Sequence, residues 1–483
     1  MHHALTANED LRLTAWSHAR SFAVPTSMIE SVAARRAVGD WAGACAAARV
    51  DVDLDLKTAG RARGEQFVAR LRDDLRHLAP DLLRWHFPRI APDGLLRSGI
   101  TATLARYGPG GVHLVARTPP SWAGAGQRIS LALWDPDRPR DGAGRHPHPR
   151  PDRRFRFDLH RHLWDARRAG ELRERGGWPT MSEPDAPGPA ASGPAAPGAV
   201  TSGATATGAL VVEPDAAEVL ALVDGCAVDR WADEAALLLR ADGSEGRAVT
   251  VRLTSRHRLV LRLDDAREPR LTGESRRDRS RVRAVLPDAA TWVPPDVELL
   301  RAGLIELDRL HPLVAAALRP GHGPPGAPRS PDAPRGSRLV DCRGAAHRIA
   351  VVDGVLVPLD HDPVELRREE LLVALGGPGL PCLRAIDEVH RAPESLVDVR
   401  ARLDHGDAAG ALDVVEGLLG PEAVLRQGVL RDELDAAARG RIAHGLFRAG
   451  LGGRRTPFPW NWENRRGVAP RLRRSAHRIP LHH

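Results

Sequence analysis

The sequence predicts an α+β, multi-domain protein in which antiparallel β meanders pack with helices. Apolar residues recur at helical spacing near both ends of the chain, which predicts helical hairpins there, and segments of alternating apolar residues lie between them. A third observation is a set of Pro/Gly/Ala-rich stretches without any apolar period, which we expect to be disordered linkers. With 483 residues and 42% hydrophobic content, the chain has room for about two to four domains.

Composition divides the chain into three compact units joined by linkers. The predicted parts are 1–182, helical hairpins plus a meander that carries a disordered insertion at 135–152; 183–208, a disordered linker; 209–318, a smaller α+β domain; 319–336, a second disordered linker; 337–453, a β-hairpin plus helical domain; and 454–483, an Arg/Trp-rich tail. Because the linkers are rich in Pro, Gly and Ala, they cannot bury enough apolar surface to fold.

The first unit begins with an apolar pattern that predicts a helical hairpin over 28–49, where Gly39 ends the first helix and Asp40 caps the second. A helix follows over 64–89, with apolar residues at helical spacing. Alternation then predicts four antiparallel strands, at 100–107, 112–118, 127–134 and 153–160.

For the second unit, the sequence predicts a helix at 214–225, three strands and a closing helical stretch at 297–318. The three predicted strands are 234–241, 247–254 and 257–264. The third unit opens with a hairpin around Asp353-Gly354. The motif G-D-x-A-G-A occurs at 39–44 and again at 406–411, and this turn resembles those of helical-hairpin repeats of the tetratricopeptide type.

Composition also excludes several classes of protein. The chain has no apolar run of about 18 residues, as a membrane span requires, and its N-terminal segment lacks a secretory pattern. The four cysteines are far apart and form no C-x-x-C, which argues against a zinc knuckle or a disulfide framework. We therefore expect a cytoplasmic protein with no membrane partner and no cofactor.

The net charge of +8, from 70 basic and 62 acidic residues, suggests a nucleic-acid partner. However, Lys57 is the only lysine and asparagine is rare, as expected for the codon usage of a high-GC bacterial genome. Part of the arginine excess therefore reflects mutational bias toward GC-rich codons and not selection for binding phosphate. Lys57 lies in LDLKTAG, which excludes a P-loop, and D-F-G, G-x-S-x-G and H-E-x-x-H are absent.

The best candidate metal site is Asp158, His160 and His162 in RFRFDLHRHLW. On a strand these three side chains would share one face, and carboxylate and imidazole are suitable ligands for zinc. Two other interpretations compete with this one. The three residues could form the solvated face of the meander, or Asp158 could cap a helix that begins at His160.

Two acidic clusters are weaker candidates. A strand over VDVDLDLK would place Asp51, Asp53 and Asp55 on one face. Their repulsion would be tolerable if the carboxylates were solvated or paired with arginines, and a cation would relieve it better. A second cluster, Asp360, His361, Asp362 and Glu365, lies where a strand passes into a helix. It faintly resembles metal-dependent phosphohydrolases, whereas helix capping by the Asp-Pro pair is the simpler interpretation.

The tail mixes clustered arginines with tryptophans, in the segment that contains Trp460, Trp462, Arg465 and Arg466. Arginines and exposed aromatic rings can bind a single-stranded nucleic acid by charge and stacking. The same residue types dominate protein-binding hot spots. Alternatively, the two tryptophans could pack on the protein's own core.

These observations favour a non-enzymatic, cytoplasmic interaction or scaffold protein of unknown pathway, because no set of nucleophile, base and oxyanion donors can be recognised. The expected partner is an unidentified protein, and nucleic acid is possible. The enzyme alternative is a metal-dependent hydrolase that uses His160 and His162 or the cluster Asp360, His361 and Asp362. A second alternative is a nucleic-acid-binding protein that acts through the Arg/Trp tail.

Overall fold

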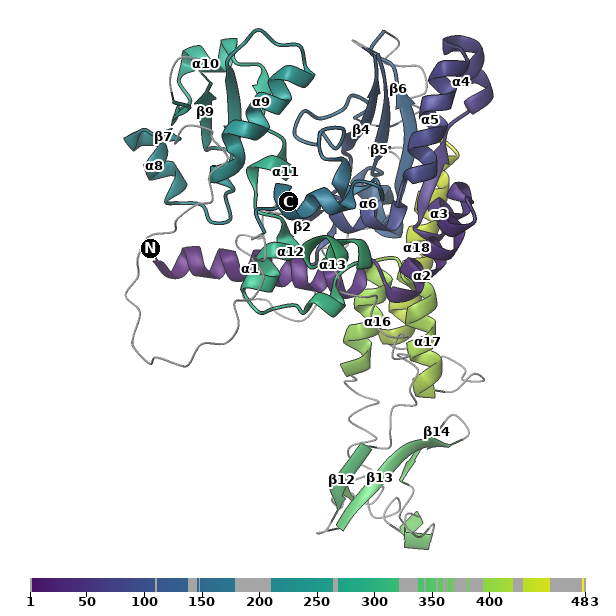
Figure 1. Ribbon diagram of the computed structural model, residues 1–483. Helices are drawn as coiled ribbons and strands as arrows, with labels where there is room; N and C mark the ends of the chain where they lie inside the picture. The colour runs from purple at the N-terminus through teal and green to yellow at the C-terminus, as the bar shows by residue number, and fades with distance from the viewer. Residues whose placement is uncertain are drawn as a thin grey trace.

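The computed structural model confirms the α+β class (Figure 1). It describes residues 2–108, 111–137, 146, 148–178, 210–263, 268–320, 338–342, 345–352, 355–358, 362, 364–365, 367–368, 380–381, 394–419, 429–451 and 480–481. The predicted linkers 183–208 and 319–336 fall almost entirely outside these residues. The predicted domain boundaries therefore stay a prediction.

The first unit is built on a four-stranded sheet in the order β1-β6-β5-β4. Its strands are β1 (Val50–Asp53), β4 (Thr101–Tyr107), β5 (Val112–Arg117) and β6 (Ile129–Trp134). The expected meander is confirmed, since β5 is antiparallel to both neighbours, while β1 joins β6 in parallel. Successive side chains of β5 point to opposite faces: Leu114 belongs to the main core, whereas Val115 packs against Trp134 on the other face.

Among the described residues, the first unit also contains six α-helices before β2 (Arg89–Ile90). They are α1 (His2–Phe22), α2 (Thr26–Ala37), α3 (Trp41–Ala47), α4 (Leu56–Arg63), α5 (Glu65–His77) and α6 (Pro80–His86). The predicted hairpin is present as α2 and α3, with Gly39 at φ +78° and Asp40 accepting a hydrogen bond from the Gly43 amide. The single helix expected over 64–89 is two helices, because Pro80 has no amide hydrogen to continue α5 and instead occupies the first turn of α6.

The fourth strand predicted for the meander, over 153–160, is wrong. This segment makes one isolated bridge, between Thr103 and Arg156, and otherwise runs in turns. Short helical turns follow at η2 (Arg161–Leu163), η3 (Ala169–Glu171) and α7 (Leu172–Arg175). Phe155 and Phe157 are nevertheless buried, so the alternation of apolar residues in this segment indicated burial and not strand pairing.

The second unit contains a five-stranded sheet in the order β11-β8-β9-β10-β7. The strands are β7 (Val211–Val212), β8 (Ala248–Arg252), β9 (Arg258–Arg262), β10 (Arg270–Gly273) and β11 (Ala284–Val285), with helices α8 (Pro214–Leu220), η4 (Val228–Arg230), α9 (Trp231–Ala241), α10 (Arg276–Arg281) and α11 (Asp288–Thr291). The predicted strands at 247–254 and 257–264 are confirmed as β8 and β9.

The strand predicted at 234–241 is wrong, because this segment lies in helix α9. Its buried residues Trp231, Ala235, Leu238 and Leu239 are spaced four, seven and eight residues from the first, which is a helical stripe. A short apolar run such as Ala235–Leu239 fits a strand or a buried helix equally well. The tryptophan that begins the stripe lies outside the predicted segment.

The closing helical stretch of the second unit is also divided, into α12 (Pro295–Arg301), η5 (Leu307–Arg309) and α13 (Pro312–Leu318). Gly303 adopts φ +66° after α12, and Pro312 begins α13. Val297, Val314 and Leu318 join the core of the first unit. Figure 1 shows α12 and α13 below the two larger sheets, and α12 contacts α1, so this part of the second unit packs with the first.

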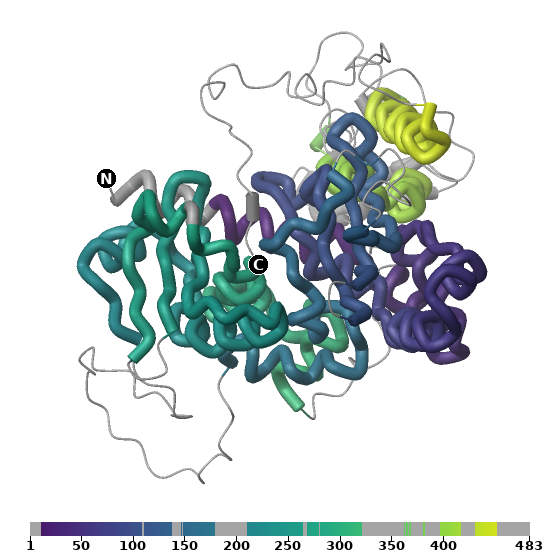
Figure 2. The backbone as a smooth tube through the Cα atoms, turned by 90° about the horizontal axis from the view of Figure 1, so that it is seen from above, coloured from purple at the N-terminus to yellow at the C-terminus, as the bar shows by residue number. Residues whose placement is uncertain are grey.

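The third unit has a three-stranded sheet of β12 (Arg338–Cys342), β13 (Ala345–Val352) and β14 (Val355–Pro358), followed by helices α16 (Glu394–Asp404), α17 (Ala408–Leu419) and α18 (Val429–Arg448). The expected hairpin is confirmed, because β13 pairs antiparallel with β14. A small sheet joins β2 (Arg89–Ile90), β3 (Leu95–Leu96) and β15 (Pro480–Leu481). In Figure 2, helices α16 to α18, in yellow-green, lie beside the first unit.

Candidate functional site

The segment from Arg153 to Arg175 contains the predicted metal site, and its charged side chains form a network of hydrogen bonds and ion pairs. It lies between the two larger units and contacts both. Arg154 makes a paired, buried salt bridge with Asp288, which begins α11. Arg156 joins Asp158 at 2.8 Å and also reaches Asp242 at the end of α9. The segment therefore connects the two units by arginine–carboxylate pairs.

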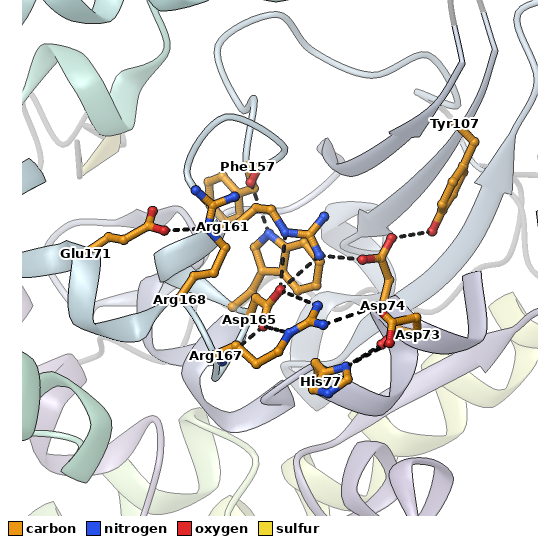
Figure 3. Close-up of polar contacts among 11 residues, drawn as sticks. Asp73, Asp74, His77, Tyr107, Phe157, Arg161, Asp165, Arg167, Arg168 and Glu171 are labelled. Carbon is orange, nitrogen blue, oxygen red and sulfur yellow. Dashed lines mark hydrogen bonds and ion pairs between the residues drawn. The ribbon is translucent and has the colours of Figure 1, made fainter. Parts of the chain in front are cut away.

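On the side of the first unit, Asp74 of α5 lies between two donors (Figure 3). The Tyr107 hydroxyl donates a hydrogen bond of 2.8 Å to Asp74 Oδ2, and the Arg161 guanidinium pairs with Oδ1. Tyr107 is the only tyrosine of the chain. Burial and the charge of Asp74 raise the pKa of Tyr107. This phenol is thus a hydrogen-bond donor and not a base at neutral pH.

A second carboxylate, Asp165, accepts from Arg161 at 2.9 Å and from Arg167 at 3.1 Å (Figure 3). Burial opposes the ionisation of Asp165, but hydrogen bonds from these two arginines outweigh it and lower the pKa of the carboxyl group. Arg161 also lies over the ring of Trp164, 4.4 Å from its centroid. Each of these charged side chains has a partner of opposite charge, as expected of a network that holds the segment on α5 and stabilises the fold.

His160 and His162 lie next to this network and are buried, so the interpretation of a solvated strand face is wrong. The interpretation of a helix capped by Asp158 is also wrong, because the short helical turn that follows has His160 at its N-cap and no side-chain cap. His160 Nε2 lies 3.2 Å from Glu234 Oε2, on α9 of the second unit. Glu234 is also paired with Arg175 at 2.5 Å. Burial opposes the ionisation of Glu234, yet the partners His160 and Arg175 lower its pKa to about 2.

The predicted metal set is only partly brought together. The His160 and His162 rings are adjacent, with centroids 5.8 Å apart, whereas both oxygens of Asp158 accept hydrogen bonds from Arg156. Across the described part of the chain, no group of three or more His, Cys, Asp or Glu residues has a metal-binding arrangement. A metal at Asp158, His160 and His162 stays a prediction, and ion pairing explains the positions of Asp158 and His160.

The three aspartates of the first acidic cluster are each bound to protein groups. Asp51 accepts hydrogen bonds from Arg128 at 2.6 Å and lies 3.3 Å from His444 Nε2 of α18. Asp53 pairs with Arg448, also on α18. Asp55 caps α4, since its side chain accepts from the amides of the next turn. Of the alternatives for this cluster, pairing with arginine is the one observed at Asp51 and Asp53.

The C-terminal hairpin α16–α17 contacts the first unit through its turn. The His405 carbonyl oxygen accepts from Arg49 at 2.9 Å and from Arg84 at 3.2 Å. Arg49 also pairs with Asp407 at 3.0 Å. Arg84 is fully buried and donates hydrogen bonds to backbone carbonyl oxygens. Burial, then the charges of Arg49 and Arg89, lowers the pKa of Arg84, so this guanidinium depends on the inserted turn for a hydrogen bond.

Some predicted site residues lie outside the described residues. These are Trp460, Trp462, Arg465 and Arg466 of the tail, and Asp360 and His361 of the second acidic cluster. Asp362 is described: it is exposed and its Oδ1 accepts from the Val364 amide at 2.9 Å. That contact is the capping geometry expected from the simpler interpretation.

The sequence did not reveal three groups that make the contacts described above: Asp74, Glu234 and the turn at His405. Asp74 and Glu234 face segments far away in the chain, so no local spacing signals them. The turn had a signal, its repeated G-D-x-A-G-A motif, although nothing in the motif indicated what it would contact.

No helix among the described residues is long and apolar enough to cross a membrane. A search of protein-family models finds none that matches the chain, and neither a curated protein nor a solved structure matches it significantly.

Proposed function

We propose that this chain is a non-enzymatic interaction protein whose helical hairpins serve as docking modules for an unidentified protein partner. The observation that supports this proposal is the insertion of the α16–α17 turn into the first unit, where its His405 carbonyl oxygen accepts from Arg49 and Arg84. Within one chain, this hairpin already acts as a ligand for another structural unit.

The two hairpins share one turn geometry. The amide of Asp40 donates to Arg35 O at 2.9 Å, and the amide of Asp407 donates to Arg402 O at 2.7 Å. Arg35 also pairs with Asp40, and Arg402 with Asp407, each five residues apart. The preceding glycines have φ of +78° and +81°. The hairpin is therefore a repeated module, as expected of a protein that uses helical pairs for binding.

The α16–α17 hairpin still exposes apolar side chains beyond its contact with the first unit. Val397 on α16 is 65% exposed and Leu412 on α17 is 44% exposed. Single exposed apolar residues are common on protein surfaces. On a repeated docking module, however, they are the natural contacts for a further protein.

A pull-down with the full chain tests this proposal. We expect Val397→Asp with Leu412→Asp to reduce the recovery of the specific partner at least about tenfold, because each buried carboxylate costs more than about 1.4 kcal/mol. The matched control is Leu222→Asp with Leu304→Asp, which changes side chains that are 44% and 51% exposed in the second unit. Equal recovery with both double variants would contradict the proposal.

The enzyme alternative is tested by metal analysis of protein purified without a histidine tag. A hydrolase that uses His160 and His162 requires a stoichiometric metal ion, such as zinc or manganese, with an open coordination position. If one metal ion per chain is found, and it is lost in the His160→Ala, His162→Ala variant, the interaction proposal is wrong.

A further inference from the structure

The second unit contains a pocket that the hairpin docking proposal does not involve. It lies at one end of the five-stranded sheet, beside α10, and has a volume of about 510 Å³. Five of its eleven lining residues are arginines: Arg247, Arg262, Arg277, Arg281 and Arg283. Asp278 is the one acidic side chain among the lining residues that the structure describes.

Sheet topology gathers three of these arginines. Strands β11, β8 and β9 are neighbours. Arg283 and Arg247 immediately precede β11 and β8, and Arg262 ends β9 directly opposite Ala248, the first residue of β8. Because adjacent strands are about 4.8 Å apart, these three arginines lie close together at the same end of the sheet.

Helix α10 supplies the other two. Arg277 and Arg281 are four residues apart and therefore lie on the same face of the helix. Asp278 is already engaged: it forms the capping box with Ser275 and pairs with Arg262 at 2.5 Å. Arg281 and Arg283 have exposed side chains and no ion pair with a described residue. Among the lining residues that the structure describes, five are thus arginines and one is a carboxylate.

We propose that this pocket binds a compact, phosphate-bearing anion, such as the polyphosphate group of a small molecule. Guanidinium forks bind phosphate oxygens in pairs, and several of them converge here on one concave site. A volume of about 510 Å³ is typical of a small-molecule site. An extended acidic peptide would instead need a groove along the surface.

The probe for this site is inorganic tripolyphosphate, titrated calorimetrically into the full chain at low ionic strength. We expect saturable binding of one equivalent, weakened at least about tenfold in Arg281→Gln with Arg283→Gln, since two charge-assisted contacts are lost. Arg240→Gln with Arg256→Gln is the control. It removes the same charge from exposed positions of the same unit, outside the pocket, and should bind as the parent chain does.

Three outcomes would overturn the proposal. The first is the absence of saturable binding. The second is an equal loss of affinity in both double variants, which would show that tripolyphosphate responds to net charge alone. The third is equally strong competition by a tetra-glutamate peptide, which would remove the preference for phosphate. Because all four arginines are exposed, the thermal midpoints of both variants should equal that of the parent, and this measurement accompanies each titration.

Discussion

At the scale of single residues, His162 shows what burial does to a polar group in this protein. Its imidazole is 4% exposed, and Nδ1 has no hydrogen-bond partner among the described residues. Burial, reinforced by the charges of His160 and Arg175, holds the pKa of His162 well below its usual value. The ring is therefore neutral in the folded protein at neutral pH.

This state makes stability depend on pH. Below the usual histidine pKa of about 6.5 the unfolded chain binds a proton at this position, whereas the folded chain does not until the pH reaches its much lower folded pKa. The folded state therefore loses up to about 1.4 kcal/mol per pH unit as the pH falls below 6.5. We expect His162→Gln to reduce the acid-side slope of the unfolding free energy, measured by urea titration between pH 7.5 and 5.

The control for this measurement is His77→Gln, which changes a histidine at the surface of α5 that bonds to a backbone carbonyl. We expect His162→Gln to change the slope more than His77→Gln does. An unchanged slope in the His162 variant would mean that other buried groups, such as His405, account for the acid sensitivity.

At the scale of elements, the two hairpin turns have the same backbone and different surroundings. A Cβ added at Gly39 would meet nothing within 4 Å, whereas one at Gly406 would lie 2.8 Å from the Gly126 carbonyl oxygen. Both glycines have positive φ, so alanine is strained at either position. The second turn is also pressed against the first unit, which leaves no room for a side chain.

We therefore expect Gly406→Ala to destabilise the protein more than Gly39→Ala does. The backbone cost of about 1–2 kcal/mol is common to both, and overpacking against the fixed carbonyl adds about 1–3 kcal/mol at Gly406. Chemical denaturation of the two variants in parallel measures the difference. Equal losses would show that the α16–α17 turn is not held against Gly126 in solution.

At the scale of the whole molecule, the N-terminal helix α1 and the helices near residue 300 form one seam. Arg20 pairs with Asp296 at 2.6 Å, with both side chains buried, and Arg12 pairs with Glu298 at 2.5 Å. Residues of α12 and α13 also share the core of the first unit. The second unit is thus attached to the first by packing as well as by the chain.

Limited proteolysis tests this organisation together with the predicted linkers. Composition predicts the first cuts within 183–208 and 319–336, while a cut within 135–152 should release no domain. Because the seam is buried, we expect the fragments on either side of 183–208 to separate on a denaturing gel and to co-elute in native gel filtration. Resistance to cleavage in both linkers would show that the boundaries are wrong, and separation under native conditions would rule out the seam.

Several features of this protein follow from the sequence alone because they depend on interactions within a few residues. The turn at Gly39 needs only a residue that tolerates positive φ, a cap, and apolar neighbours at the right period. The antiparallel pairing of β13 with β14 likewise follows from two alternating apolar segments that are close together in the sequence. The strands β4, β5 and β6 were predictable for the same reason, since their alternating pattern is local.

Only the tertiary structure decided which charges meet. Arginine is so common in this chain that no single arginine signals a partner, and carboxylates such as Asp296 and Glu234 pair with residues far away in sequence. The same holds for the arginine-lined pocket, which three strands and a helix assemble. The helix over 231–241 and the turns over 153–160 were decided by burial against neighbouring elements, because short apolar runs fit several local structures and only packing selects one.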